Sequence, residues 1–338
     1  MRRIATAAMI AAALAGLLPA GAAADVAQSA SRQRAGARAA PCLARLSDEH
    51  PSPARAAAAL TKPRAGDAWL DRVRAFSPGI TAGFGADRLP DIVLGRPEGL
   101  GADQGSLDVV SLGKGGSIVV SFDDNAVMDG PGDDLVIFEN AFHAGSSEGP
   151  LFTEYAFVEV SRDGRNWLRF PHDPQSGQGL AGQAPVFAAS SNNIDPLSQA
   201  AGGDRFDIGA LGIDLVRYVR LTDAGDEVDD YGNHSFPGTK GGFDLDAAAA
   251  LHSVPLGRIA GVVTMNGQPL PGQVVRLRCD DETHWRRRRT RSDGRYRFAR
   301  LLPGCDYTIR ALVPGQPTQE QQTYLDLEQL QADADFAF

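Results

Sequence analysis

Short strand-like segments are the feature that most constrains the fold of this chain. From Ala68 onward, runs of β-branched and aromatic residues alternate with Gly, Pro, Asn and Asp, and stripes of helical period are almost absent. This pattern is typical of antiparallel sandwiches. The clearest predicted strands are 117–122, 135–140, 155–161, 167–170, 216–222, 259–265, 274–278, 296–298 and 307–313. We therefore expect an all-β protein.

A hairpin in the middle of the chain carries a first resemblance. Asp163-Gly164 is a tight turn signal, and YAFVEVSRDGRNWLRF together with VRYVRLTD resembles the discoidin-type, galactose-binding-like jelly roll of extracellular binding modules. The resemblance implies that Trp167 packs in the core. VLGRPEG, GGDRFDIGALGIDLVRYVRLTD and GGFDLDAAAALH are also similar to bacterial secreted or cell-surface proteins with this sandwich. A jelly-roll β-sandwich with a calcium site is therefore expected over residues 67–252.

The end of the chain carries a second resemblance. The stretches GRIAGVVTMNGQPLPGQVVRLRC and TRSDGRYRFARLLPGCDYTIRALVP resemble the carboxypeptidase regulatory-like domain, which has the carbohydrate-binding-like fold. The resemblance implies a smaller transthyretin-like or Ig-like β-sandwich, which we expect over residues 256–338. Domains of this kind are accessory and do not catalyse: some stabilise a neighbouring domain and some bind glycans.

The start of the chain has the three parts of a secretory signal peptide. Two arginines follow Met1, an apolar run extends to Pro19, and small residues end at Ala24. The apolar run is shorter than the roughly 20 residues of a membrane-spanning helix. We expect a signal peptide at 1–24, no membrane span after its cleavage, and a periplasmic, extracellular or cell-surface location. Residues 25–66, rich in Ala, Arg, Ser and Pro, are expected to be a disordered linker.

Export would place the cysteines in an oxidising compartment. Cys279 and Cys305 are close enough in sequence to close a small loop, so we expect a disulfide bond between them. Cys42 is then left over, and the branched apolar residue that a lipoprotein cleavage site carries three positions before the cysteine is missing. The role of Cys42 stays open.

Acidic residues are concentrated in the middle of the chain. Residues 66–252 contain 29 Asp and Glu against 12 Lys and Arg, whereas residues 253–338 contain 10 against 12. An acidic surface repels phosphate backbones, so we expect no nucleic-acid partner. The run Arg286–Arg289 is expected to lie in a solvated hairpin arm because turn-forming residues follow it. A polyanion-binding patch is the alternative.

The densest acidic segment, 121–142, places six carboxylates and two asparagines around a Gly-Pro-Gly turn. Oxygen ligands on a flexible turn suit Ca²⁺, which takes roughly six to eight oxygens at loose geometry. The motif at 241–247 adds two more carboxylates on a predicted final strand. We expect both segments to contribute to one calcium site. Its candidate ligands are Asp124, Asp129, Asp133, Asp134, Glu139, Asp244 and Asp246.

Alternatives remain open for these acidic residues. Each carboxylate could instead cap a turn, because Asp and Asn bond readily to nearby backbone groups. The acidic loop at 226–230 could bind a second, weaker ion or be simply solvated. The spacing within 123–134 is not that of an EF-hand, because its glycines stand at the wrong offsets and the closing Glu is missing.

No catalytic motif has the context that it needs. Gly145–Gly149 matches G-x-S-x-G, but no helix and no βαβ pattern follows it. The six histidines form no zinc-protease motif, and Gly113–Gly116 has the wrong neighbours for a phosphate loop. Carboxylate pairs are abundant, but metal binding competes for them. We expect a protein that is not an enzyme.

Two aromatic residues are the candidates for ligand contacts. Tyr231 lies in the glycine-rich loop beside the acidic residues, and Trp285 lies beside the arginine run. Sugar sites combine an aromatic platform with polar groups. We therefore expect a calcium-stabilised exported protein that recognises a glycan or another cell-surface ligand. The alternatives are a structural or adhesive surface protein with purely structural calcium, and an accessory component of an uptake system.

Overall fold

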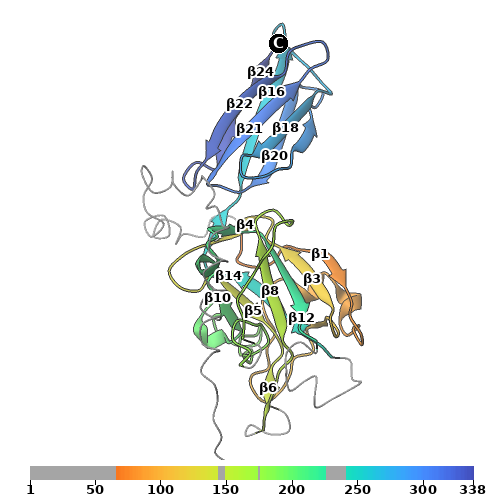
Figure 1. The fold of residues 1–338 in the computed structure, drawn as a ribbon, viewed down its shortest axis with the longest axis vertical. Coiled ribbons are helices and arrows are strands. Elements are labelled where there is room, and N and C mark those ends of the chain that lie inside the picture. Colours follow the sequence, from red (N-terminus) through yellow and green to blue (C-terminus); the bar gives the residue numbers. More distant parts are fainter. Residues whose placement is uncertain (1–65, 144–148, 174–175, 226–240) are drawn as a thin grey trace, which may run out of the picture. The chain divides into compact units, whose positions relative to one another are not determined.

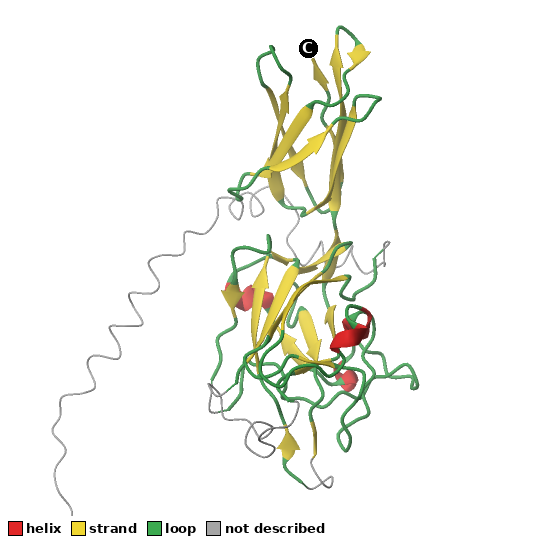
Figure 2. Ribbon diagram, turned by 90° about the vertical axis from the view of Figure 1, so that its right-hand side faces the viewer, coloured by secondary structure: helices red, strands yellow, loops and turns green. Residues whose placement is uncertain are grey.

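The computed structural model describes residues 66–143, 149–173, 176–225 and 241–338. Strands and loops make up nearly all of these residues, as Figure 2 shows, and they contain no α-helix. The helical segments among them are short 3-10 turns: η2 (Ala86–Arg88), η3 (Asp91–Val93), η4 (Gln199–Ala201) and η5 (Ile208–Leu211). The predicted all-β fold class is confirmed.

The first sandwich, which we define as residues 70–255, has a five-stranded antiparallel sheet as one layer (Figure 1). Alternate residues of its central strand are buried, so the sheet has one core face and one outer face. In order, its strands are β1 (Arg72–Ser77), β3 (Ser117–Ser121), β12 (Tyr218–Asp223), β8 (Ala156–Ser161) and β9 (Leu168–Arg169).

Shorter strands form the opposing layer and its margins. One sheet contains β10 (Asp204–Phe206), β5 (Leu135–Phe138) and β14 (Ala247–Ala250), and another contains β11 (Leu215–Val216), β4 (Asn125–Met128) and β15 (Ser253–Pro255). Two-stranded sheets pair β13 (Asp244–Leu245) with β2 (Val110–Ser111), and β6 (Phe142–His143) with β7 (Leu151–Phe152). The strand β5 is buried along its whole length at the centre of its sheet.

The two layers enclose a large apolar core. Val120, Val158 and Val219 of the five-stranded sheet cluster with Ile137 of β5 and Ala248 of β14, and all of them are at most 1% exposed. Removing apolar surface from water is worth about 25 cal/mol per Å², so this core is the main source of stability for the first sandwich. Polar side chains at its margin are therefore held in fixed, poorly hydrated positions.

The second sandwich, which we define as residues 257–338, packs two sheets around a core of its own that includes Val263, Phe298 and Ile309. In one sheet β16 (Gly257–Met265) pairs with β17 (Gln268–Pro269), β20 (Arg295–Leu301), β23 (Gln331–Asp333) and β24 (Phe336–Ala337). The other sheet has the order β19 (Arg286–Arg289), β18 (Val274–Cys279), β21 (Cys305–Leu312) and β22 (Gln319–Leu325).

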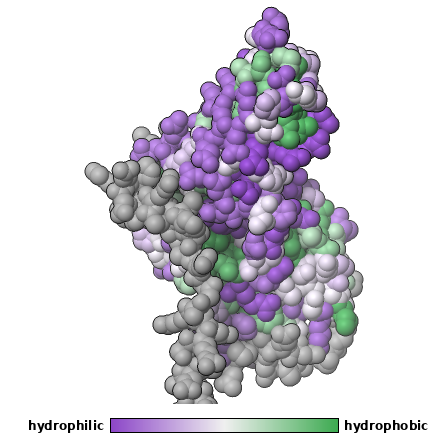
Figure 3. All heavy atoms as spheres, turned by 45° about the horizontal axis from the view of Figure 1, so that its top comes forward, coloured by the Kyte–Doolittle hydropathy of each residue, from purple (hydrophilic) through white to green (hydrophobic). Residues whose placement is uncertain are grey.

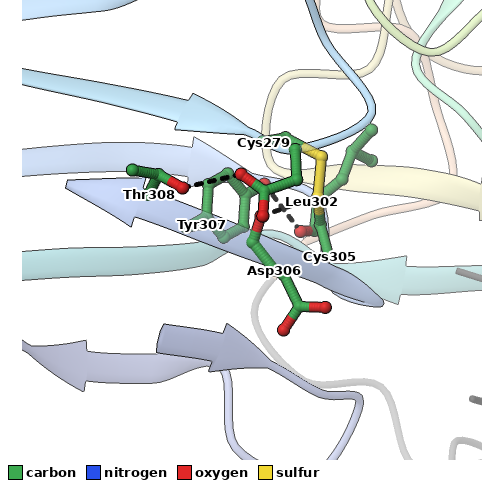
Figure 4. The surroundings of a disulfide bond; sticks show 7 residues. Cys279, Leu302, Cys305, Asp306, Tyr307 and Thr308 are labelled. Atoms are coloured by element: carbon green, nitrogen blue, oxygen red, sulfur yellow. Dashed lines mark hydrogen bonds between the residues drawn. A yellow bond between two sulfur atoms is a disulfide. The ribbon is translucent and has the colours of Figure 1, made fainter. Parts of the chain in front are cut away.

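A disulfide bond joins Cys279, the last residue of β18, to Cys305, the first residue of β21 (Figure 4). Both cysteines are buried in the core of the second sandwich. Beside them the buried Tyr307 hydroxyl donates a hydrogen bond of 2.8 Å to the carbonyl of Leu302. The structure thus contains the disulfide expected from the sequence.

One expectation about the core is wrong. The ring of Trp167 lies 4.5 Å from the guanidinium carbon of Arg220 and is only half buried, and the next residue, Leu168, is exposed. Arg220 stands on the outer face of the five-stranded sheet, between the buried Val219 and Leu221. Trp167 therefore stacks on a cation at the surface, because the hairpin leads it to the outer face of the sheet.

Several expectations concern residues outside the described ranges. These are the signal peptide at 1–24, the linker up to residue 65 with Cys42, the acidic loop at 226–230 with Tyr231, and most of Gly145–Gly149. They stay predictions.

The disulfide leads to a prediction about stability. The cross-linked cysteines are 26 residues apart, and closing a loop of this size in the unfolded chain is worth about 2–4 kcal/mol. A Cys279→Ala/Cys305→Ala variant should therefore lose about that much unfolding free energy in the second sandwich, measured by denaturant titration. Cys42→Ala is the control and should leave the midpoint unchanged. Free thiols at both positions in the oxidised wild-type protein would contradict the pairing.

Candidate cation site

Four carboxylates meet near the end of β5, and we call them the Glu139 cluster. Glu139 follows the last residue of β5, Asp204 opens the neighbouring strand β10, Asp244 opens β13, and Glu154 lies just before β8. Three of them are buried: Glu139 is 2%, Glu154 4% and Asp204 8% exposed. All three partners are close enough to Glu139 to repel its charge. Strand pairing thus collects acidic groups from four distant parts of the sequence.

Three members of the cluster are held by hydrogen bonds. One carboxylate oxygen of Asp204 accepts from the backbone N–H groups of Gly182 at 2.7 Å and Gln183 at 3.1 Å. Glu154 accepts from the N–H of Gly242 at 2.6 Å. These bonds aim the acids at fixed positions but supply no positive charge.

Asp244 is held in a similar way by neutral donors. It accepts from the Ser111 hydroxyl and, at 3.4 Å, from the side-chain amide of Asn140, the residue next to Glu139. The carbonyl oxygen of the same amide accepts from the backbone N–H of Ser106, which fixes its orientation. The two sides of the Asn140 amide therefore tie the loop at 106 to the strand at 244.

Glu139 differs from the other three acids. Its Oε2 atom is buried and has no hydrogen-bond partner among the described residues. Within the described part of the chain, neither Glu139 nor Asp204 nor Asp244 forms an ion pair with Lys, Arg or His. The backbone of Asn140 hydrogen-bonds to this carboxylate, but the buried Oε2 atom is left without a donor, which carries a desolvation cost of at least about 1–3 kcal/mol. A proton or a cation at this atom would remove the cost.

The pKa values follow from this environment. Burial first, and then repulsion by Asp244, Glu154 and Asp204, raises the pKa of Glu139 well above its usual range. Burial raises the pKa of Asp204 to about 7 against the lowering effect of its backbone hydrogen bonds. It raises the pKa of Asp244 to about 6. The folded chain therefore binds protons at this cluster more tightly than the unfolded chain does.

A second acidic group lies in the turns around β4 and η5. Carboxylate oxygens of Asp129, Asp134 and Asp207 lie within 4.8 Å of one another. Both oxygens of Asp134, which is fully buried, are already bonded: they accept from the N–H groups of Gly130 at 2.7 Å and Ile208 at 3.0 Å. The Nδ1 atom of His252 lies 2.8 Å from one of them.

These bonds give the second group a structural role. Asp134 braces the Gly-Pro-Gly turn against η5, and Asp207 caps η5 by accepting from the N–H of Ala210 at 3.3 Å. Burial, followed by repulsion from Asp134, Asp207 and Asp214, raises the pKa of Asp129. Asp134 and Asp207 thus accept hydrogen bonds within their own turns, whereas the buried Oε2 atom of Glu139 accepts none from the described residues.

The remaining expected ligands lie apart from both groups. Asp133 is exposed on the turn. Asp124 is also exposed, and its pKa is raised to about 6 by partial burial and then by the charges of Asp71 and Asp67. Asp246 is buried and accepts from the backbone N–H of Glu98 at 3.0 Å. The structure therefore distributes the seven expected ligands over several places and does not bring them into one site.

The sequence pattern missed two members of the cluster, Glu154 and Asp204. Each is a lone acid beside a predicted strand or a double glycine, whereas the expected ligands stand in acidic runs. Their signal was an isolated charge at the edge of an apolar segment. Such a position is informative only when another acid is known to lie across the sheet.

A third group of potential ligands carries no metal chemistry. Cys279, Asp281 and Cys305 place sulfur and oxygen atoms within 4.8 Å of one another, but the two sulfurs are bonded to each other as a disulfide. A disulfide sulfur has no thiolate charge to offer a metal ion. The two cysteines are therefore part of the core of the second sandwich, and Asp281 is exposed beside them.

Trp285, the expected ligand contact in the second sandwich, is half buried. The guanidinium carbons of Arg310 and Arg278 lie 4.6 Å and 4.9 Å from the centre of its ring. Trp285 thus stands within a cluster of arginines rather than as a lone aromatic platform.

The comparisons with known proteins bear mainly on the second sandwich. Residues 258–337 match the model of the carboxypeptidase regulatory-like domain. This agrees with the resemblance expected from the sequence for that part of the chain. The resemblance of residues 67–252 to the discoidin-type sandwich stays a prediction. No curated protein matches the chain.

Some solved structures show weak similarity. The dioxygenase domain of a dioxygenase and carbohydrate-binding protein fusion from Streptomyces sp. SirexAA-E is 18% identical, with a TM-score of 0.20, over 24% of this chain and 77% of that one. The pilus 2b backbone protein of group B streptococcus is 11% identical, with a TM-score of 0.24, over 67% and 93%. The major pilin subunit of Bacillus cereus is 9% identical, with a TM-score of 0.24, over 70% and 66%. Similarities this weak carry no conclusion for this chain.

The described residues hold no helix that is both long enough and apolar enough to cross a bilayer.

The raised pKa values predict how stability depends on pH in chelator. Because Asp204 and Asp244 bind protons more tightly in the folded state, their contribution is fully present below about pH 4 and is lost as the pH rises through about 6 and 7. Asp204→Asn removes one titration and keeps an oxygen that accepts hydrogen bonds. The unfolding free energy of the variant, relative to wild type, should therefore rise by about 2–3 kcal/mol between about pH 5 and about pH 8. A difference that is independent of pH would contradict the raised pKa of Asp204.

Proposed function

We propose that this chain is an exported, non-catalytic surface module whose first sandwich is stabilised by a divalent cation, Ca²⁺, bound at the Glu139 cluster. The observation that carries the proposal is the buried Oε2 atom of Glu139, which has no partner among the described residues and faces a set of like charges. A bound cation would turn this repulsion into attraction. It would also remove the cost of holding Glu139 ionised in a poorly hydrated place.

The donor set favours calcium over other metals. All four members of the cluster offer carboxylate oxygens, which are hard ligands, and no thiolate or imidazole belongs to the cluster. Calcium accepts six to eight oxygens at about 2.3–2.6 Å in irregular geometry, whereas magnesium needs a near-ideal octahedron. The carboxylates of the Glu139 cluster are spaced more widely than those of Asp129, Asp134 and Asp207. Closing on an ion therefore requires side-chain rotation, which the larger and more tolerant Ca²⁺ permits.

The location of the cluster supports a structural role for the ion. Glu139, Glu154, Asp204 and Asp244 come from four separate segments, so one ion would add a further link between parts of the first sandwich that strand pairing and hydrogen bonds already join. The cluster is buried, so the ion would have little surface on which to hold a ligand. The burial of the cluster therefore favours a structural calcium ion over one that contacts a ligand directly.

Export and the absence of catalysis rest on separate grounds. The signal-like first 24 residues favour export. The match of residues 258–337 to the carboxypeptidase regulatory-like domain favours an accessory, non-catalytic role for the second sandwich. Together with an ion that stiffens the first sandwich, these features suit a protein that works outside the cytoplasm as a binding or structural component of the surface.

The cation site is tested by calorimetry on the purified full-length chain. After stripping with EDTA, Ca²⁺ at about one hundred times its Kd should add about 2.7 kcal/mol to the unfolding free energy. For a domain of this size, the midpoint should rise by about 5–10 °C. Mg²⁺ should have a smaller effect. No shift at millimolar Ca²⁺ would exclude the site.

Variants locate the ion within the molecule. Glu139→Gln keeps the size of the side chain and removes its charge, so the calcium response should disappear while the midpoint in EDTA at neutral pH stays at or above that of wild type. Asp133→Asn, on the exposed turn, is the matched control and should keep the full response. Loss of the response in Asp133→Asn but not in Glu139→Gln would move the ion to the Gly-Pro-Gly turn.

A further inference from the structure

Three arginines of the second sandwich form a row across adjacent strands, and we call them the arginine row. In the register of the sheet, Arg276 of β18 stands opposite Arg287 of β19 on one side and Arg310 of β21 on the other. Directly opposed residues have Cβ atoms about 4.5–5.5 Å apart and share one face of the sheet. The three Cα positions therefore repeat at about the strand spacing of 4.8 Å, and the side chains project from the same face.

The row lies on the outer face of its sheet. Arg276 is exposed between the buried Val275 and Leu277, and Arg310 stands between the buried Ile309 and Ala311. Hydrophilic residues cover much of the face of the second sandwich that Figure 3 presents. The arginine row is thus available to solvent, while the opposite face of the sheet belongs to the core.

The charges in the row are only partly compensated. Arg310 forms an ion pair of 2.5 Å with Glu320 of β22. The guanidinium groups of Arg276 and Arg287 form no ion pair and donate no hydrogen bond to any described residue. Like charges directly opposite one another destabilise a sheet. The fold keeps this unfavourable arrangement where neutral polar residues would be more stable, which points to an anion outside the chain.

A tryptophan and a fourth arginine extend the row. Trp285 contacts the guanidinium groups of both Arg310 and Arg278. The Nε atom of Arg278 is buried and has no acceptor among the described residues. Stacking on an aromatic ring limits the rotation of both arginines, so less conformational entropy is lost when they bind an anion.

Protection of a sheet edge does not account for the row. Charged side chains on an edge strand prevent pairing with a second molecule, and β19 is the edge strand of this sheet. Arg276 and Arg310, however, belong to β18 and β21, which are interior strands and already paired on both sides. Their charge protects no edge.

We infer that the arginine row, with Arg278 and Trp285, binds a linear acidic polysaccharide through its repeated carboxylate or sulfate groups. The planar fork of arginine matches such oxyanions with two parallel hydrogen bonds. A linear glycan with an acidic group on each sugar presents such oxyanions in a row along its length. Nucleic acid fits less well, because single-strand binding uses aromatic platforms for bases and Trp285 is already engaged by two arginines.

This inference rests on the proposed exported, non-catalytic role. It does not depend on the bound cation. Binding of the purified full-length chain to immobilised polygalacturonate and dextran sulfate is therefore measured in EDTA. Both polymers should bind, and the affinity should fall as salt is raised because the contacts are ionic. Neutral dextran should not bind. Equal binding of neutral dextran, or tighter binding of single-stranded DNA than of either acidic polymer, would overturn the proposal.

Substitutions then test the row itself. Arg276→Gln/Arg287→Gln should lower the affinity for both acidic polymers at least about tenfold, because charge-assisted hydrogen bonds are lost. The thermal midpoint of this variant should not fall, since like charges are removed from neighbouring strands. The matched control is Arg295→Gln/Arg297→Gln, which also removes two charges, from exposed positions in the other sheet, and which should leave the affinity unchanged. Equal losses in the two variants would show an unspecific effect of net charge and would overturn the proposal. The single variants Arg276→Gln and Arg287→Gln give the same test if the double variant does not fold.

Discussion

Glu139 is buried among like charges, and the cation site that we propose for the first sandwich depends on this burial. The core draws the fully apolar strand β5 into the centre of its sheet, and the next residue along the chain is a carboxylate that remains 2% exposed. Neighbouring strands then bring Glu154, Asp204 and Asp244 to the same place. The hydrophobic effect thus holds like charges together in a poorly hydrated place. Only protons or a cation can offset the electrostatic cost.

Elsewhere the same sandwich meets a similar cost with its own side chains. Asp123 is 5% exposed, and Arg72, Arg74 and Arg217 of this sandwich all pair with it. Arg217 is itself buried, so the pair is stable only while both partners are present. The first sandwich alone thus supplies three arginines to Asp123, whereas the described residues supply no cationic side chain to Glu139. The second sandwich shows the reverse imbalance, with arginines that lack acids. Both imbalances point to partners outside the chain: a cation for the first sandwich and an anionic polymer for the second.

The features that depend on local sequence patterns could be predicted. The strand segments followed from β-branched runs and turn residues, and the disulfide followed from the short separation of Cys279 and Cys305. The features that depend on pairing between distant strands could not be predicted. Asp204 joins Glu139 only because β10 pairs with β5, and no local pattern announces that pairing. The family resemblance predicts a core position for Trp167, and it carries no information about Arg220, on which the ring stacks in the structure. The arginine row likewise exists only in the sheet, because its three members lie in different strands.

A cation at Glu139 is tested most directly by a crystal structure of the protein grown with Ca²⁺, refined together with one grown in EDTA. We expect a single strong density peak at the Glu139 cluster in the calcium crystal, with carboxylate oxygens of Glu139 and at least one of its three partners at about 2.3–2.6 Å from it. The peak should be absent from the EDTA crystal. A calcium crystal in which the Oε2 atom of Glu139 instead contacts a protein donor or an ordinary water, with no ion at the cluster, would contradict the account.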